Sequence, residues 1–220
     1  MPNHVQNILT ITGHKNHVEP MLRHLEDGKD KFSFGKIIPM PDELQGTRSP
    51  ANIVSEAEYK KLQYEKNFSA EPNPMFNDKG SITQKMSDDW KERFGADNWY
   101  DWTTSHWGTK WGAYGVTINE PIHLGDGQME VDIYFQTAWS SGAQVLSTLA
   151  ENYKTIEFHL TYADEDCGYN TGKIWWKNGF TENSDIPEHS MDNYFECWGG
   201  EEDWECVDGE WKWKDDDEDC

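Results

Sequence analysis

The sequence has few basic residues: 19 Lys and Arg stand against 41 Asp and Glu, which gives a formal net charge of −22. Lysine and arginine supply the attraction to a phosphate backbone, so this balance argues against direct binding of nucleic acid and favours a basic protein partner. No apolar stretch is long enough to span a membrane, and Met1 to Gln6 contains no basic segment followed by an apolar run. We therefore expect a cytoplasmic protein that does not bind membranes.

Cysteine is also scarce. The four cysteines, Cys167, Cys197, Cys206 and Cys220, all lie in the last quarter of the chain, and none forms a C-x-x-C pair. We expect free thiols and no structural zinc site. The sequence has no phosphate-binding glycine loop, no dinucleotide fingerprint and no G-x-S-x-G frame either. These absences predict a protein without a metal or another cofactor.

Two residue groups still raise the question of chemistry. Asp164 to Asp166 follow a predicted strand and could hold a divalent cation, but the spacing of an EF-hand loop is missing, so a strand-end turn is the better interpretation. Cys167 and His159 could form a nucleophile and base pair. Alternation, however, points His159 to a sheet face and leaves Cys167 in a loop. We therefore predict no catalytic residues and no enzyme; a hydrolase is the weakest of the function hypotheses.

The first 38 residues predict a strand, a helix and a second strand. Residues 5–12 alternate between apolar and polar side chains, which is typical of a half-buried strand. The next residues, to about Glu26, carry apolar side chains at helical spacing, and Asn16 with Glu19 forms a capping-box signature. Lys31 to Ile38 then resembles a second strand.

The character of the sequence changes between Asp42 and Asn98, where no strand pattern is convincing. Ser55 to Asn67 and Ser81 to Phe94 are predicted helices, because Ser55 with Glu58 and Ser81 with Gln84 form capping boxes. We therefore expect a mainly helical insertion over about residues 42–108.

The clearest pattern follows the insertion. Strands are predicted at 114–118, 129–135, 156–162 and 173–177, and a helix runs from an N-cap at Ser141 to Tyr153. Strands around two helices on one face describe a split β-α-β sheet. We predict an α+β, ferredoxin-like domain over residues 1–178, followed by an acidic, tryptophan-rich extension over 179–220. Its open sheet face is expected to carry Glu130, Asp132, Tyr134, Gln136, Glu157, His159 and Thr161.

Four of the 12 tryptophans lie between Trp99 and Val116. Such a cluster is typical of a corner where several elements meet, and this structural interpretation is favoured. The alternative is a small-ligand site, for a nucleotide signal, in which rings stack on the base. Lys110 would then hold a phosphate, although a cation–π contact with a neighbouring ring is the favoured interpretation. The residues of this alternative site are Trp107, Lys110, Trp111 and Trp139.

Three segments resemble the YubB-like proteins of conjugative plasmids and bacteriophages. They are Asn3-His4-Val5, Trp107-Gly108-Thr109-Lys110-Trp111 and Phe135-Gln136-Thr137-Ala138-Trp139-Ser140. The resemblance covers about residues 1–178. It implies a ferredoxin-like C-terminal domain, a mobile-element origin in a bacterial host cytosol and an action on host machinery or host defence. It implies no catalytic residues.

Residues 203–214 predict a β-hairpin, because Asp208-Gly209 between alternating residues is a strong signal for a two-residue turn. The turn pairs Val207 with Glu210, Cys206 with Trp211, Glu205 with Lys212, Trp204 with Trp213, and Asp203 with Lys214. One face then carries Trp204, Cys206, Trp211 and Trp213. A lone hairpin is marginal in water, so this face should dock. Its own domain is the favoured support, and a partner or a second copy of the chain is the alternative.

The negative charge is concentrated late in the chain, where residues 164–220 hold 19 Asp and Glu against four Lys. A solvated acidic tail is the ordinary interpretation of the final run. The alternative is an acidic surface that imitates nucleic acid and occupies a basic groove of a host or defence protein. The preferred function is accordingly a non-enzymatic protein that binds and inhibits such a partner. Its predicted binding residues are Trp204, Trp211, Trp213, Asp215, Asp216, Asp217 and Glu218.

Overall fold

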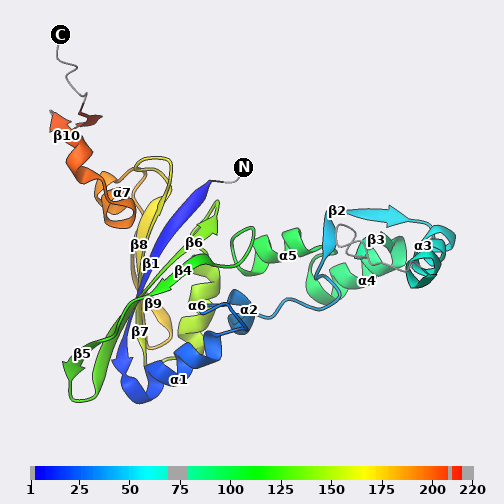
Figure 1. The fold of residues 1–220 in the computed structure, drawn as a ribbon, viewed down its shortest axis with the longest axis horizontal. Helices are drawn as coiled ribbons and strands as arrows, with labels where there is room; N and C mark the ends of the chain where they lie inside the picture. The colour runs from blue at the N-terminus through cyan, green and yellow to red at the C-terminus, as the bar shows by residue number, and fades with distance from the viewer. Residues whose placement is uncertain (1–2, 69–78, 208–209, 215–220) are drawn as a thin grey trace, which may run out of the picture.

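An antiparallel sheet forms the centre of the protein (Figure 1). A computed structural model describes residues 3–68, 79–207 and 210–214. The strand order is β4-β6-β1-β7-β8-β9, and β5 also pairs with β6. The strands are β1 (His4–His14), β4 (Tyr114–Ile118), β5 (Ile122–Gly125), β6 (Gln128–Ala138), β7 (Glu157–Asp164), β8 (Thr171–Lys177) and β9 (Phe180–Asp185).

Strand β1 lies between β6 and β7 and is antiparallel to both, so Leu9 faces Ile133 on one side and Leu160 on the other. These three side chains have no exposed surface. Because β6 and β7 run parallel to each other with β1 between them, β6, α6 and β7 form the split β-α-β unit that the sequence predicts. The fold is α+β and ferredoxin-like.

Helices α1 (Lys15–Leu25) and α6 (Ala143–Asn152) cover one face of this sheet. Each buries an apolar stripe, which includes Val18 and Met21 of α1. Both predicted N-caps are wrong. The His14 ring accepts the Asn16 amide hydrogen at 3.2 Å, and Gly142, in the left-handed region at φ 68°, precedes α6 in place of Ser141.

The strand predicted at Lys31 to Ile38 is wrong, because this segment contains the short helix α2 (Phe34–Ile37). Both long edges of β1 are already paired with β6 and β7. Phe32 and Phe34 are instead both buried, and their rings contact Phe135 on the helix-covered side of the sheet. Residues two apart also share one face of a strand, so the spacing of Phe32 and Phe34 looked like strand alternation and did not reveal the short helix.

The opposite sheet face is not open as predicted. Helix α7 (Met191–Trp198) packs there on β7, β1 and β8, and Thr161 is 2% exposed beneath it. Strand β9 pairs with β8, so the sheet itself continues beyond residue 178. Glu130, Asp132, Tyr134, Gln136 and His159 are half-buried, and Glu157 is exposed.

The insertion extends away from the sheet (Figure 1) and contains strands that the sequence analysis missed. Strands β2 and β3 form a parallel pair, whose short length and irregular burial hide any alternation. The Ser55 hydroxyl caps α3 as predicted, but Thr83, not Ser81, caps α4. The elements are β2 (Thr47–Val54), α3 (Glu56–Phe68), β3 (Lys79–Thr83), α4 (Gln84–Phe94) and α5 (Trp99–His106).

Asp97 connects α4 to α5 and is 5% exposed. Its carboxylate accepts hydrogen bonds from the Ser87 hydroxyl at 2.6 Å and the Asn98 amide at 2.9 Å, and it pairs with Lys91 at 2.9 Å. Burial raises the pKa of Asp97, but these three partners outweigh burial and hold the pKa below its ordinary value of 3.8. The charged carboxylate therefore stabilises the base of the insertion.

We expect Asp97→Asn to lower the free energy of unfolding by about 1.5–3 kcal/mol, the usual contribution of hydrogen bonds to a buried charge. Urea unfolding measures this loss. The matched control is Asp89→Asn, which removes an exposed pair with Arg93 and should cost less than about 1 kcal/mol. Equal losses in the two variants would contradict the assigned role of Asp97.

The same substitution should flatten the acid dependence of stability. A depressed carboxyl pKa stabilises the fold above the unfolded-state value, and this contribution disappears as the pH falls below 3.8 through the lower folded-state value. The free energies of unfolding of the wild type and Asp97→Asn should therefore converge as the pH falls from 5 to 2. Parallel curves across this range would contradict the prediction.

Candidate functional site

Helix α7 supplies the base of a candidate binding surface at the C-terminal end. It begins after Ser190, whose hydroxyl accepts the Asn193 amide hydrogen at 3.2 Å. Glu196 fixes the helix to the sheet, because its carboxylate accepts a hydrogen bond from Thr161 at 3.0 Å and pairs with Lys173 at 2.5 Å. The Phe195 side chain of this helix is buried and faces the chain segment that follows α7.

The C-terminal hairpin rests on Phe195. Strands β10 (Trp204–Val207) and β11 (Glu210–Trp213) follow the short helix η1 (Glu201–Asp203), and their pairing confirms the predicted register from Trp204 with Trp213 to Val207 with Glu210. The Phe195 ring lies 4.9 Å from Trp211 and 6.1 Å from Trp204, between ring centres. The hairpin therefore docks on its own domain, while Trp213 is 58% exposed. The turn at 208–209 lies outside the described residues.

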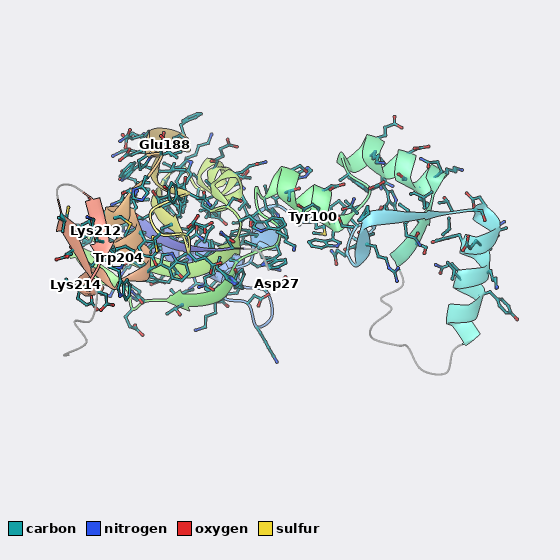
Figure 2. The ribbon with its side chains drawn as sticks, turned by 90° about the horizontal axis from the view of Figure 1, so that it is seen from above. Asp27, Tyr100, Glu188, Trp204, Lys212 and Lys214 are labelled. Carbon is teal, nitrogen blue, oxygen red and sulfur yellow. The ribbon has the colours of Figure 1, made fainter. Side chains whose placement is uncertain are left out.

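Two adjoining hollows lie around this hairpin, and we call them together the C-terminal groove. They measure about 400 and 440 Å³ and share Glu201 and Glu202. Figure 2 shows labelled Trp204, Lys212 and Lys214 at this end of the molecule, with Tyr100 at the neck that leads to the insertion. The main lining residues are Asp192, Phe195 and Glu196 in the first hollow and Trp204, Trp211 and Lys214 in the second.

The charge of the C-terminal groove is mainly negative. The Lys214 ammonium donates to the backbone carbonyl of Glu202 at 2.5 Å. Within the described part of the chain, Asp192, Glu201 and Glu202 form no ion pair, and all three are exposed. The predicted binding residues Asp215, Asp216, Asp217 and Glu218 lie outside the described residues. The groove thus brings carboxylates and indole rings together without that final acidic run.

The tryptophan cluster near α5 is largely structural, as the favoured interpretation expects. Trp102 and Trp107 are buried and meet edge to face, with 5.6 Å between ring centres. The Trp107 indole N–H donates to the carbonyl of Ile38 at 3.0 Å. This bond ties the tryptophan cluster of residues 99–116, which we call the hub, to the segment after α2. These two rings fill the corner between the sheet and the insertion.

Lys110 lies between two rings rather than at an open site. Its ammonium is 4.6 Å from the Trp111 ring centre and 4.7 Å from the Trp139 ring centre, which is the geometry of a double cation–π contact. Trp139 adopts φ 71°, unusual for a bulky residue. The backbone N–H of Trp139 donates to the Asn3 carbonyl, and its backbone carbonyl accepts from the side-chain amide of Asn170, each at 3.0 Å.

A separate hollow of about 510 Å³ adjoins the hub, and we call it the hub cavity. Trp107 and Trp111 contribute to its lining, whereas Lys110 and Trp139 do not. Its other main lining residues are His4, Asp30, Phe34 and Tyr114. The four residues of the predicted ligand site are therefore divided between this cavity and the surface stack around Lys110.

The structure does not bring together the other candidate groups. His159 stacks on Trp175 with 4.6 Å between ring centres, while Cys167 lies beside the Tyr194 hydroxyl and raises the pKa of Tyr194 to about 12. Burial raises the pKa of the Cys197 thiol to about 12, which leaves it unreactive at neutral pH. Among residues 3–68, 79–207 and 210–214, no three His, Cys, Asp or Glu side chains cluster as a metal site requires.

No helix of the described chain combines the length and apolar character that crossing a membrane demands.

Helix α7, and with it Asp192, Phe195 and Glu196, is not among the elements predicted from the sequence. A signal was present, because Ser190 is a good N-cap and Gly199-Gly200 is a typical helix end. The hub cavity had no such signal, since His4, residues 30–35 and residues 111–114 meet only in the folded chain.

We expect Phe195→Ala to release the hairpin, because it removes the ring that supports Trp204 and Trp211. Loss of a buried phenylalanine typically costs about 3–5 kcal/mol. Hydrogen exchange of residues 204–207 should accelerate, and tryptophan emission should shift to the red. Phe180→Ala is the matched control, since that ring is 70% exposed. Unchanged exchange of the hairpin in Phe195→Ala would contradict the docking.

Comparison with family models supports the ferredoxin-like fold. Residues 110–208 match the family model described as the ferredoxin-like domain in Api92-like protein. Among solved structures, the chain is similar to protein api92 from Yersinia pseudotuberculosis, with 11% sequence identity, a TM-score of 0.43 and coverage of 86% of this chain and 99% of that chain. No curated protein matches the chain. The segment from β4 to β10, which includes α7, is thus similar to the ferredoxin-like domain of Api92-like proteins.

Proposed function

We propose that this is a non-enzymatic interaction protein that binds a basic protein through the C-terminal groove. The observation that carries the proposal is the shared wall of the two hollows, where Glu201 and Glu202 lie beside the rings of Trp204 and Trp211. Carboxylates attract lysine and arginine, and indole faces add cation–π contact, most strongly with the planar guanidinium.

The charge of the whole chain supports the same function. A net charge of −22 attracts a basic partner over a distance and increases its rate of association. Within the groove, the docked hairpin holds its rings in place before binding, which reduces the entropy that the interface must lose. The groove would determine which partner binds, and the overall charge would increase the association rate.

A host or defence protein of a bacterium is the partner that we favour. The resemblance to YubB-like proteins of plasmids and bacteriophages supports a mobile-element origin, and such an element benefits from blocking a basic surface that normally contacts nucleic acid. Carboxylates of the groove would occupy that surface and so inhibit the partner. The described residues of the groove are sufficient for the proposal, which does not depend on the run at 215–218.

A nucleotide-binding protein built on the hub has less support. A phosphate would have to compete with Trp111 and Trp139 for the ammonium of Lys110. The hub cavity contains Asp30, which repels phosphate, and neither lysine nor arginine is among its lining residues in the described chain.

The decisive variant is Glu201→Gln with Glu202→Gln, tested against an arginine-rich peptide by fluorescence anisotropy. Two exposed charge pairs of about 0.2–1 kcal/mol each predict about two- to thirtyfold weaker binding. Binding by the wild type should also weaken as salt rises, because exposed charges are screened.

Glu182→Gln with Glu188→Gln is the matched control, because it removes the same charge from exposed positions outside the groove. It should bind like the wild type. Equal weakening in both double variants would show that net charge alone attracts the peptide and would defeat the groove proposal. Point variants are preferable to deleting residues 179–220, which would remove β9 and α7 from the sheet.

A further inference from the structure

The hub cavity has the walls of a small-molecule site. Its volume of about 510 Å³ falls within the range of ligand pockets, about 300–1,000 Å³. Phe34 and Trp107 meet edge to face at 6.1 Å between ring centres and are buried, so they form the floor of the cavity. The rings of Trp111 and Tyr114, with 6.4 Å between their centres, are half-buried and line the cavity nearer the surface. Rings held in this way offer fixed faces and edges to a planar guest.

Tyr114 provides a positioned polar group at this cavity. Its hydroxyl donates to the Thr137 carbonyl at 3.1 Å and lies 2.5 Å from His4 Nδ1. Since the hydroxyl proton is used by Thr137, we assign the proton of this contact to His4 Nδ1, which leaves Nε2 of a neutral imidazole as an acceptor. Burial, followed by the charge of Glu165, raises the pKa of Tyr114, so the phenol stays neutral at physiological pH.

The electrostatics of the cavity select against anions. Asp30 is the one carboxylate among the lining residues, and its side chain is exposed at the mouth. Neither lysine nor arginine is among the lining residues in the described chain, and the Lys110 ammonium is engaged by the rings of Trp111 and Trp139. Acceptors at Asp30 and His4 together with aromatic faces match a ligand that donates hydrogen bonds and carries positive charge.

We infer that the hub cavity binds a small aromatic amine, with its ring against Trp111 and Tyr114 and its protonated amine toward Asp30. The ring supplies most of the binding free energy through burial. The carboxylate selects the charge. This site is separate from the C-terminal groove, and its occupant is a small molecule rather than a protein.

The test uses tryptamine as the probe and titration calorimetry of the full chain. Indole-3-acetate is the matched control ligand, because it has the same ring and the opposite charge. We expect tryptamine to bind and indole-3-acetate to give no measurable heat. No binding of tryptamine, or equal binding of both compounds, would overturn the inference.

Variants locate the binding. Trp111→Ala should weaken tryptamine about tenfold or more, as expected for a lost stacking ring. Asp30→Asn, an exposed change that leaves the core intact, should weaken it about two- to fivefold. It keeps the inference testable where Trp111→Ala does not fold. Full affinity in Asp30→Asn would overturn the assigned amine position.

The double variant Glu201→Gln with Glu202→Gln separates this site from the groove. Tryptamine should bind to this variant as tightly as to the wild type, although the variant binds the arginine-rich peptide more weakly. If tryptamine binding falls with the peptide, the amine occupies the C-terminal groove and the inference about the hub cavity is wrong, although the proposed function would stand.

Discussion

Everything in the fold depends on the burial of β1 between two antiparallel neighbours. Its inward side chains, such as Leu9 and Ile11, have no exposed surface, and its backbone pairs with β6 along eleven positions and with β7 along eight. Because both edges of β1 are occupied, the chain between β1 and β6 cannot join it and is used elsewhere. That segment forms the hub and the insertion, and it supplies most of the walls of the hub cavity.

The two candidate sites differ in how they use the same excess of negative charge. In the C-terminal groove, exposed carboxylates such as Glu201 and Glu202 surround rings that the docked hairpin holds still. This arrangement suits long, basic side chains of a protein. In the hub cavity, aromatic walls dominate and Asp30 adds one charge at the mouth. Such a site suits a small ring with a single amine. Neither arrangement favours a phosphate.

Sequence reasoning succeeded where a pattern is local. The strands at 129–135 and 156–162 and the hairpin pairing of Trp204 with Trp213 were predictable, since alternation and a two-residue turn determine them within a few residues. It failed at 31–38 and 47–54. Phe32 and Phe34 pack on Phe135, which is distant in the chain, and strand β2 pairs with a segment over twenty residues away. Neither segment therefore has a local signature in the sequence.

The ferredoxin-like class, the concentration of charge near the C-terminus and the hairpin register could be predicted from the sequence alone, because each follows from periodicity, composition or a turn. The positions of the two candidate binding sites, in contrast, depend on the tertiary structure. It seated Trp204 and Trp211 on Phe195 of a helix that the sequence analysis missed, and it left Trp213 at the surface. The physical reason is that a groove or cavity is made by residues that are distant in the chain, and packing alone brings them together.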